Sequence, residues 1–183
     1  MYSRYPPIIL DACCVLNLYA SSQLSNILAA FSTRFVMVSV VFEDELLSLP
    51  PLASDKEGTA VDLESVIDEG LLSIVAFESE AELETFVNIA ATLGDDGESA
   101  TIALAIHRKW TVATDDKKAL SYLAQHAANI QTVTTPDLIK HWVEFSKPAP
   151  EILREALRSI RINGHYEPSR RHPLYEWWQQ SSA

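Results

Sequence analysis

Residues 8–18 read IILDACCVLNL, so that one apolar run ends at Asp11 and a second run follows it. The first run is short enough for a strand buried within a parallel sheet, and we expect a helix to follow it. In open α/β sheets, ligands bind beyond the carboxyl ends of the strands. This stretch therefore predicts the architecture and places an acidic residue at the edge of the sheet where function is expected.

Outward from this stretch, short apolar runs alternate with longer segments of helical periodicity. We expect strands at 7–11, 35–38, 72–77, 111–114 and 130–133. We expect helices at 41–49, within 52–69 and ending at Gly70, and at 79–92, 98–109, 116–126 and 151–162. A further helix is expected with Thr135 as its N-cap and Pro136 at its first position. This alternation predicts an α/β fold whose central, mostly parallel sheet of about five strands is flanked by helices.

The length of the chain, 183 residues, is enough for one domain with a full hydrophobic core. We assign residues 1–147 to this domain, and 148–183 to a C-terminal helical extension packed on the domain or on a partner. Its paired tryptophans, Trp177 and Trp178, favour such packing over contact with RNA. The only two cysteines are adjacent, which excludes a disulfide scaffold and a structural zinc site.

The net charge of −11 opposes a broad basic face of the kind that grips nucleic acid. Residues 140–183 hold 7 basic and 5 acidic residues and are the more basic part of the chain. We expect the acidic run at 78–84 to face solvent, and His107 to be a surface residue. Since no apolar run approaches the roughly 20 residues of a membrane span, a cytoplasmic protein is expected.

Acidic residues recur where the expected strands end or where the next helix begins. They form four groups: Asp11; Glu43, Asp44 and Glu45; Asp95, Asp96 and Glu98; and Asp115 with Asp116. If the sheet is parallel, the four groups converge at one edge. Neighbouring carboxylates repel one another, and protonation or a hard divalent cation relieves the repulsion, which points to Mg2+ or Mn2+.

Divalent ions held by carboxylates can activate water and stabilise the leaving oxygen when a phosphodiester is cleaved. A nuclease is therefore the leading hypothesis from the residues alone. The alternative for any single group is ordinary capping of a helix N-terminus by Asp or Glu. Four groups together favour the metal site over capping.

Four segments of the chain resemble, in order, the motifs of PIN-domain ribonucleases. Residues 9–18 are similar to the opening motif, with its Asp at position 11. Residues 39–46 resemble the second motif, in which Glu45 is the better match and Glu43 the reserve. Residues 96–105 look like the Gly-Glu variant of the third motif, and 112–119 resemble the strand-Thr-x-Asp motif that ends in Asp116. The resemblance covers about residues 8–145.

The resemblance implies a PIN-like three-layer fold and a metal-dependent endoribonuclease, such as the toxin of a toxin–antitoxin pair. The residues implied to be catalytic are Asp11, Glu45, Glu98 and Asp116. With Asp96 and Asp115 they form the candidate ligand set for Mg2+ or Mn2+. Asn17 and Thr114 would support the carboxylates, and Lys117 and Lys118 would contact the RNA backbone. A homodimer and an antitoxin partner are also implied.

A competing hypothesis is a PIN-like module that binds or scaffolds and has little or no catalytic activity. It is supported by the acidic net charge, by the aromatic extension, and by Cys13 and Cys14 where hydroxyl or amide side chains often follow the first Asp. A flap-type DNA nuclease shares the carboxylate chemistry but generally needs a longer chain. Metal binding discriminates the nuclease from the scaffold.

Overall fold

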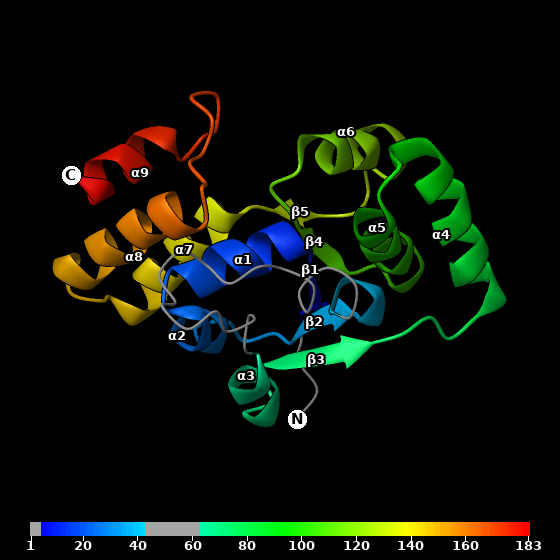
Figure 1. Ribbon diagram of the computed structural model, residues 1–183, viewed down its shortest axis with the longest axis horizontal. Helices are drawn as coiled ribbons and strands as arrows, with labels where there is room; N and C mark the ends of the chain where they lie inside the picture. Colours follow the sequence, from blue (N-terminus) through cyan, green and yellow to red (C-terminus); the bar gives the residue numbers. More distant parts are fainter. Residues whose placement is uncertain (1–4, 43–62) are drawn as a thin grey trace.

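The computed structural model describes residues 5–42 and 63–183 and is built on a parallel β-sheet (Figure 1). Its five strands are Ile8–Leu10 (β1), Phe35–Val38 (β2), Leu72–Val75 (β3), Thr111–Ala113 (β4) and Thr132–Val133 (β5). They lie in the order β3-β2-β1-β4-β5, and each pair of neighbours is parallel. The α/β fold predicted from the sequence is confirmed, and the sheet of described strands is wholly parallel.

The middle strand, β1, is fully buried because its apolar side chains are covered on both faces of the sheet. From β1 the chain builds outward to β2 and β3, and then returns to the other side of β1 for β4 and β5. Ligands of α/β sheets bind at such a reversal, beyond the carboxyl ends of the two strands. Leu10 of β1 pairs with Ala113 of β4. The residues that follow them, Asp11 and Thr114, therefore lie side by side where the strand order reverses.

Nine helices lie within the described residues and flank the sheet. They are Ala12–Ala20 (α1), Leu24–Ala29 (α2), Glu64–Asp68 (α3), Glu80–Leu93 (α4), Asp96–Arg108 (α5), Lys117–His126 (α6), Thr135–Ser146 (α7), Pro150–Asn163 (α8) and Tyr175–Ser182 (α9). In Figure 1, α4, α5 and α6 lie together to one side, and α1, α2, α7, α8 and α9 lie to the other. No helix in this part of the chain is both long and apolar enough to cross a membrane.

Helices α4, α6 and α8 begin within one residue of the expected positions, and the starts of α7 and α5 differ because of their caps. The N-cap of α7 is Thr134 and not Thr135, because the Asp137 carboxylate accepts the Thr134 N–H at 2.9 Å. Thr135 is the first helical residue, and its N–H donates to the Asp115 carboxylate at 3.0 Å. Helix α5 begins at Asp96, two residues early, because the Asp95 carboxylate caps the N–H of Glu98 at 2.9 Å. The helix expected at 41–49 falls almost wholly outside the described residues.

The last two helices pack on the rest of the molecule. Helix α8 packs against α1, and α9 packs against α8. Trp178 of α9 is 1% exposed and meets the Tyr166 ring edge to face, with ring centroids 6.0 Å apart. The Lys140 ammonium lies 4.9 Å from the centre of the Trp177 ring. Both tryptophans therefore serve packing contacts.

One residue of the acidic run at 78–84 does not face solvent as expected. Glu82 is 5% exposed and accepts the Arg108 Nε at 2.7 Å, where α4 packs on α5. This hydrogen bond holds the pKa of the Glu82 carboxyl down to about 2. The expectation was wrong because a guanidinium from a helix 26 positions away neutralises this carboxylate inside the packed interface.

Candidate functional site

Asp11 joins the end of β1 to the start of α1, at the point where the sheet order reverses. It is the N-cap of α1, and its carboxylate accepts the Ala12 N–H at 3.0 Å and the Thr114 hydroxyl at 2.8 Å. The Cys13 thiol also donates to it, at 3.1 Å. The side chain is 3% exposed, and this burial raises the pKa of its carboxyl in spite of the three donors.

Asp116 occupies the corresponding place after β4. It is the N-cap of α6, and one carboxylate oxygen accepts the N–H groups of Lys118 at 2.6 Å and Ala119 at 2.9 Å. Thr114 links Asp116 to Asp11, since its hydroxyl donates to the Asp11 carboxylate and accepts the Asp116 N–H at 3.1 Å. The ends of the two central strands are therefore joined through one threonine side chain.

Helix α5 supplies two more acids. Asp95 caps the helix, and Glu98 is the third residue of its first turn and is partly buried. The pKa of Glu98 is raised to about 7, first by burial and then by the negative charges of Asp116, Asp95 and Asp11, with Lys118 acting in the opposite sense. We call these four acids the carboxylate cluster; three of them raise the pKa of Glu98, and Asp95 also raises that of Asp11.

The other members of the expected ligand set are placed differently. Asp96 is exposed in the first turn of α5. Glu43 and Glu45 lie outside the described residues. Asp115 precedes Asp116 directly in sequence, but its carboxylate is held by a separate set of donors.

Asp115 is anchored from three parts of the chain. Its carboxylate accepts the Asn17 amide at 3.0 Å, the Thr135 N–H at 3.0 Å and the Tyr166 hydroxyl at 2.9 Å. The Thr135 hydroxyl donates to it as well. Asn17 therefore supports a carboxylate, as expected, and this carboxylate is Asp115. Sequence reasoning missed Thr135 and Tyr166, because these contacts span 20 and 51 residues without a local pattern.

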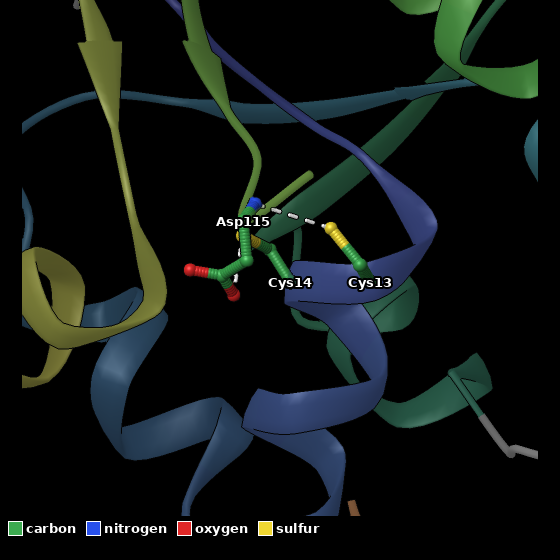
Figure 2. A group of neighbouring side chains, drawn as sticks. All are labelled: Cys13, Cys14 and Asp115. Carbon is green, nitrogen blue, oxygen red and sulfur yellow. Dashed lines mark hydrogen bonds between the residues drawn. The ribbon is translucent and has the colours of Figure 1, made fainter. Parts of the chain in front are cut away.

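Cys13 and Cys14 point from α1 toward Asp115 (Figure 2). The two sulfurs and a carboxylate oxygen of Asp115 lie within 4.8 Å of one another, and this cysteine group could hold a metal ion. The Cys13 sulfur accepts the Asp115 N–H at 3.3 Å. Cys14 is fully buried, which raises the pKa of its thiol well above the usual value. The hydroxyl that supports Asp11 comes from Thr114 of the neighbouring strand instead of from residue 13.

An open groove of about 450 Å³ runs along α6, starting where that helix leaves the carboxylate cluster. Lys117 and Lys118 line it at one end, and Tyr122 and His126 line it further along. The rings of Tyr122 and His126 lie 4.6 Å apart, centre to centre. Both lysines are exposed.

The chain was also compared with known proteins. No family model matches it, and no curated protein matches it.

Proposed function

We propose that the protein is a metal-dependent endoribonuclease whose active site is the carboxylate cluster. The observation that carries the proposal is geometric: Thr114 bonds both Asp11 and Asp116 at the carboxyl ends of β1 and β4, and α5, which Asp95 caps and which carries Glu98 in its first turn, packs on α6. The pKa of Glu98, which burial and the charges of the other three acids raise to about 7, agrees with this arrangement. A cluster of this kind is destabilised by its own charge unless protons or cations compensate it. A bound divalent cation would compensate this negative charge and would also supply the chemistry of phosphodiester cleavage.

Helix capping accounts for part of the cluster. Asp11, Asp95 and Asp116 each cap a helix, and a cap alone needs no metal. Capping does not account for Glu98, which lies inside α5 and caps nothing there. Three helix N-termini brought together around a fourth, partly buried acid favour a binding site over three separate caps.

The oxygen donors of the cluster would suit Mg2+ or Mn2+, and a bound ion would have to draw them together, since among the described residues only the cysteine group has three ligand atoms within 4.8 Å. All four residues of the carboxylate cluster offer oxygen ligands, which hard divalent cations prefer. Glu45, which the second motif nominates, would add a further oxygen ligand. A cation bound there would act as a Lewis acid toward the scissile phosphate and would make water more acidic. Thr114 keeps Asp11 and Asp116 in place, since it is bonded to both.

The α6 groove is the proposed contact for the RNA strand. Lys117 and Lys118 would meet phosphates at the end nearest the carboxylate cluster. Further along, the paired rings of Tyr122 and His126 offer a surface on which an unpaired base can stack. Lys117 and Lys118 are positively charged in a chain of net charge −11, and they would attract a polyanion to this end of the groove.

The proposal extends to the biological setting. The protein would act in the cytoplasm as the toxin of a toxin–antitoxin pair, as a homodimer that an antitoxin protein inhibits. The support for this setting is the resemblance of the four motifs to PIN-domain ribonucleases.

A second candidate is a PIN-like binding or scaffold protein with little or no catalytic activity. The burial of Asp11 favours it, because a carboxyl with a raised pKa can stay protonated and so stand in the cluster without a cation. This protein would bind Mn2+ weakly or not at all.

Cleavage of a mixed RNA pool by the purified full chain tests the proposal. We expect cleavage with Mn2+ or Mg2+, none with chelator, and none from Asp116→Asn. Asp68→Asn, which changes an exposed acid of α3, is the matched control and should cleave like the parent. Cleavage that persists with chelator, or in Asp116→Asn, would contradict the proposal.

The pKa of Glu98 predicts how Mn2+ affinity depends on pH. Because this pKa is about 7, the carboxyl is largely protonated at pH 6 and must lose its proton to bind a cation. Mn2+ affinity should therefore rise from pH 6 to pH 8. Without metal, the stability of the fold should change in the opposite direction. Because the pKa of Glu98 rises from 4.5 to about 7 on folding, the stability that Glu98 contributes is present at low pH and is lost as the pH rises from 4.5 through 7.

Calorimetric titration at pH 6, 7 and 8 measures the affinity, and thermal denaturation with chelator measures the stability. Glu98→Gln, which has no proton to lose at this position, should flatten both dependences. A Mn2+ affinity that does not change over this range in the parent would show that Glu98 is not a ligand.

The variant Cys13→Ser tests whether Mn2+ binds at the carboxylate cluster or at the cysteine group. Sulfur ligands suit softer cations such as Zn2+, and they bind as thiolates, whereas the Cys14 thiol holds its proton firmly. A serine hydroxyl can donate to Asp11 in place of the Cys13 thiol. We therefore expect Cys13→Ser to keep the Mn2+ affinity of the parent within about threefold, by calorimetry. Loss of Mn2+ binding would place the ion at the sulfurs instead.

A further inference from the structure

The Asp115 carboxylate accepts four hydrogen bonds, and a cation in the cysteine group would have to displace some of them. One oxygen accepts the Thr135 N–H and the Tyr166 hydroxyl, and the other accepts the Asn17 amide and the Thr135 hydroxyl. A carboxylate held in this way has little capacity left for a cation. Its position makes it important for another reason, because Asp115 separates Thr114 from Asp116.

The turn that contains Asp115 also contains Thr114 and Asp116, the latter a member of the carboxylate cluster. Thr114 bonds Asp11, and Asp116 caps α6 and faces Glu98. Because the backbone is continuous, a rotation of Asp115 displaces both neighbours. The Asp115 N–H is also fixed, by the Cys13 sulfur at 3.3 Å. The donors around Asp115 therefore hold the turn in one orientation.

Tyr166 is the donor that comes from the C-terminal extension, and packing fixes its place. Its ring meets the buried Trp178, and its N–H reaches the Ile160 carbonyl at 3.4 Å. His165 before it has a φ of 50°, a left-handed turn that reverses the chain after α8. At Gly164 a Cβ would lie 2.9 Å from the Asn17 side-chain oxygen, so the extension closes directly against α1.

From these contacts we infer that Tyr166 is a positioning residue, which couples the C-terminal extension to the carboxylate cluster through Asp115. The inference rests on the proposed function. Asn17 and Tyr166 hold the Asp115 carboxylate from α1 and from the extension, so that the docked extension completes the support of the turn. Without the Tyr166 hydroxyl, the turn gains freedom and the cluster holds its cation less firmly.

Tyr166→Phe tests this inference in the full chain, because it removes the hydroxyl and keeps the ring that packs on Trp178. Loss of an outer hydrogen-bond partner of a metal site typically lowers affinity or activity about 10- to 100-fold. Since Tyr166 acts through a further residue, we expect Mn2+ affinity and kcat to fall about 3- to 10-fold, with KM for RNA unchanged. Tyr175→Phe, in the same extension, is the matched control and should change neither.

A double-mutant cycle with Asp115→Asn tests the route of the coupling. If Tyr166 acts through Asp115, adding Tyr166→Phe to Asp115→Asn should lower Mn2+ affinity by much less than it does alone. Assays are run well below the melting temperature of each variant, so that a change in stability alone leaves the Mn2+ affinity unchanged.

The outcomes separate the inference from the function on which it rests. Parent-like Mn2+ affinity and kcat in Tyr166→Phe, while the parent binds Mn2+ and cleaves RNA, would overturn the inference and leave the proposed function standing. If the parent neither binds Mn2+ nor cleaves RNA, the proposed function fails and the inference fails with it. Equal losses in Tyr175→Phe would also overturn the inference, because they would trace the effect to general loosening of the extension.

Discussion

Asp11→Asn should abolish metal-dependent RNA cleavage and leave the protein at least as stable as the parent. The activity falls because a charged oxygen ligand at the centre of the carboxylate cluster becomes a neutral amide. We expect a loss of about 100-fold or more, the scale seen when a group that stabilises developing charge is removed. The asparagine oxygen can keep the hydrogen bond from the Ala12 N–H, and the amide NH2 that replaces the second oxygen can donate to the Thr114 hydroxyl, which also accepts hydrogen bonds.

The stability is maintained because Asp11 is buried at a cost. Burial and the charge of Asp95 raise the pKa of its carboxyl in the folded protein. A raised pKa gives a contribution to folding that is present at low pH and is lost as the pH rises through the folded value. At pH 8, in chelator, the neutral asparagine should therefore melt at or above the temperature of the parent.

Thermal denaturation and RNA cleavage measured on the same preparation check both halves of this prediction. A variant that is inactive and also melts well below the parent would mean that Asp11 serves mainly as a structural cap. A variant that cleaves like the parent would remove Asp11 from the active site.

The largest effect on stability is expected for Glu82→Ala. Glu82 and Arg108 form a pair with side chains 7% and 14% exposed, joined at 2.7 Å. The same guanidinium donates to the Ala76 carbonyl at 2.8 Å and lies 5.0 Å from the centre of the Trp110 ring. Without Glu82, Arg108 keeps only the exposed Glu78 carboxylate, at 3.5 Å. Loss of one partner of a buried pair typically costs about 3–5 kcal/mol.

The effect should depend on pH in a defined direction. The pKa of Glu82 is lowered from 4.5 to about 2 in the folded protein. The pair therefore contributes its full stability above pH 4.5 and loses it as the pH falls toward 2. Urea denaturation at pH 7 should show the full loss in Glu82→Ala, and the two proteins should converge in acid.

Glu84→Ala, at an exposed position of the same helix, is the matched control for Glu82→Ala. A surface substitution of this kind should change the free energy of unfolding by about 0.5 kcal/mol or less. If the two variants lose the same small amount, the contact between Glu82 and Arg108 does not hold α4 on α5.

The strands were the most predictable part of the fold. A strand buried on both faces of a parallel sheet must be short and apolar throughout, and the runs at 8–10 and 35–38 have this property. Helix starts were less predictable, as Thr134 and Thr135 show. Either threonine can cap a helix, and the choice is made by Asp115, a residue 20 positions earlier that binds Thr135.

The sequence predicted where the candidate site lies, but it only partly predicted which side chains act there. The placement of acids after strands and before helices nominated Asp11, Glu98 and Asp116. It could not separate Asp115 from Asp116, because adjacent residues at a strand end point in different directions and find different partners. The partners of Asp115, such as Tyr166, come from distant segments that carry no recognisable motif.

Calorimetric titration of Mn2+ into the full chain at pH 8 tests the central claim most directly, because it asks whether the carboxylate cluster is a cation site before any RNA is chosen. We expect saturable binding by the parent and by Asp68→Asn, and loss of that binding in Asp116→Asn. Absence of Mn2+ binding in the parent, or binding that Asp116→Asn leaves intact, would contradict that claim.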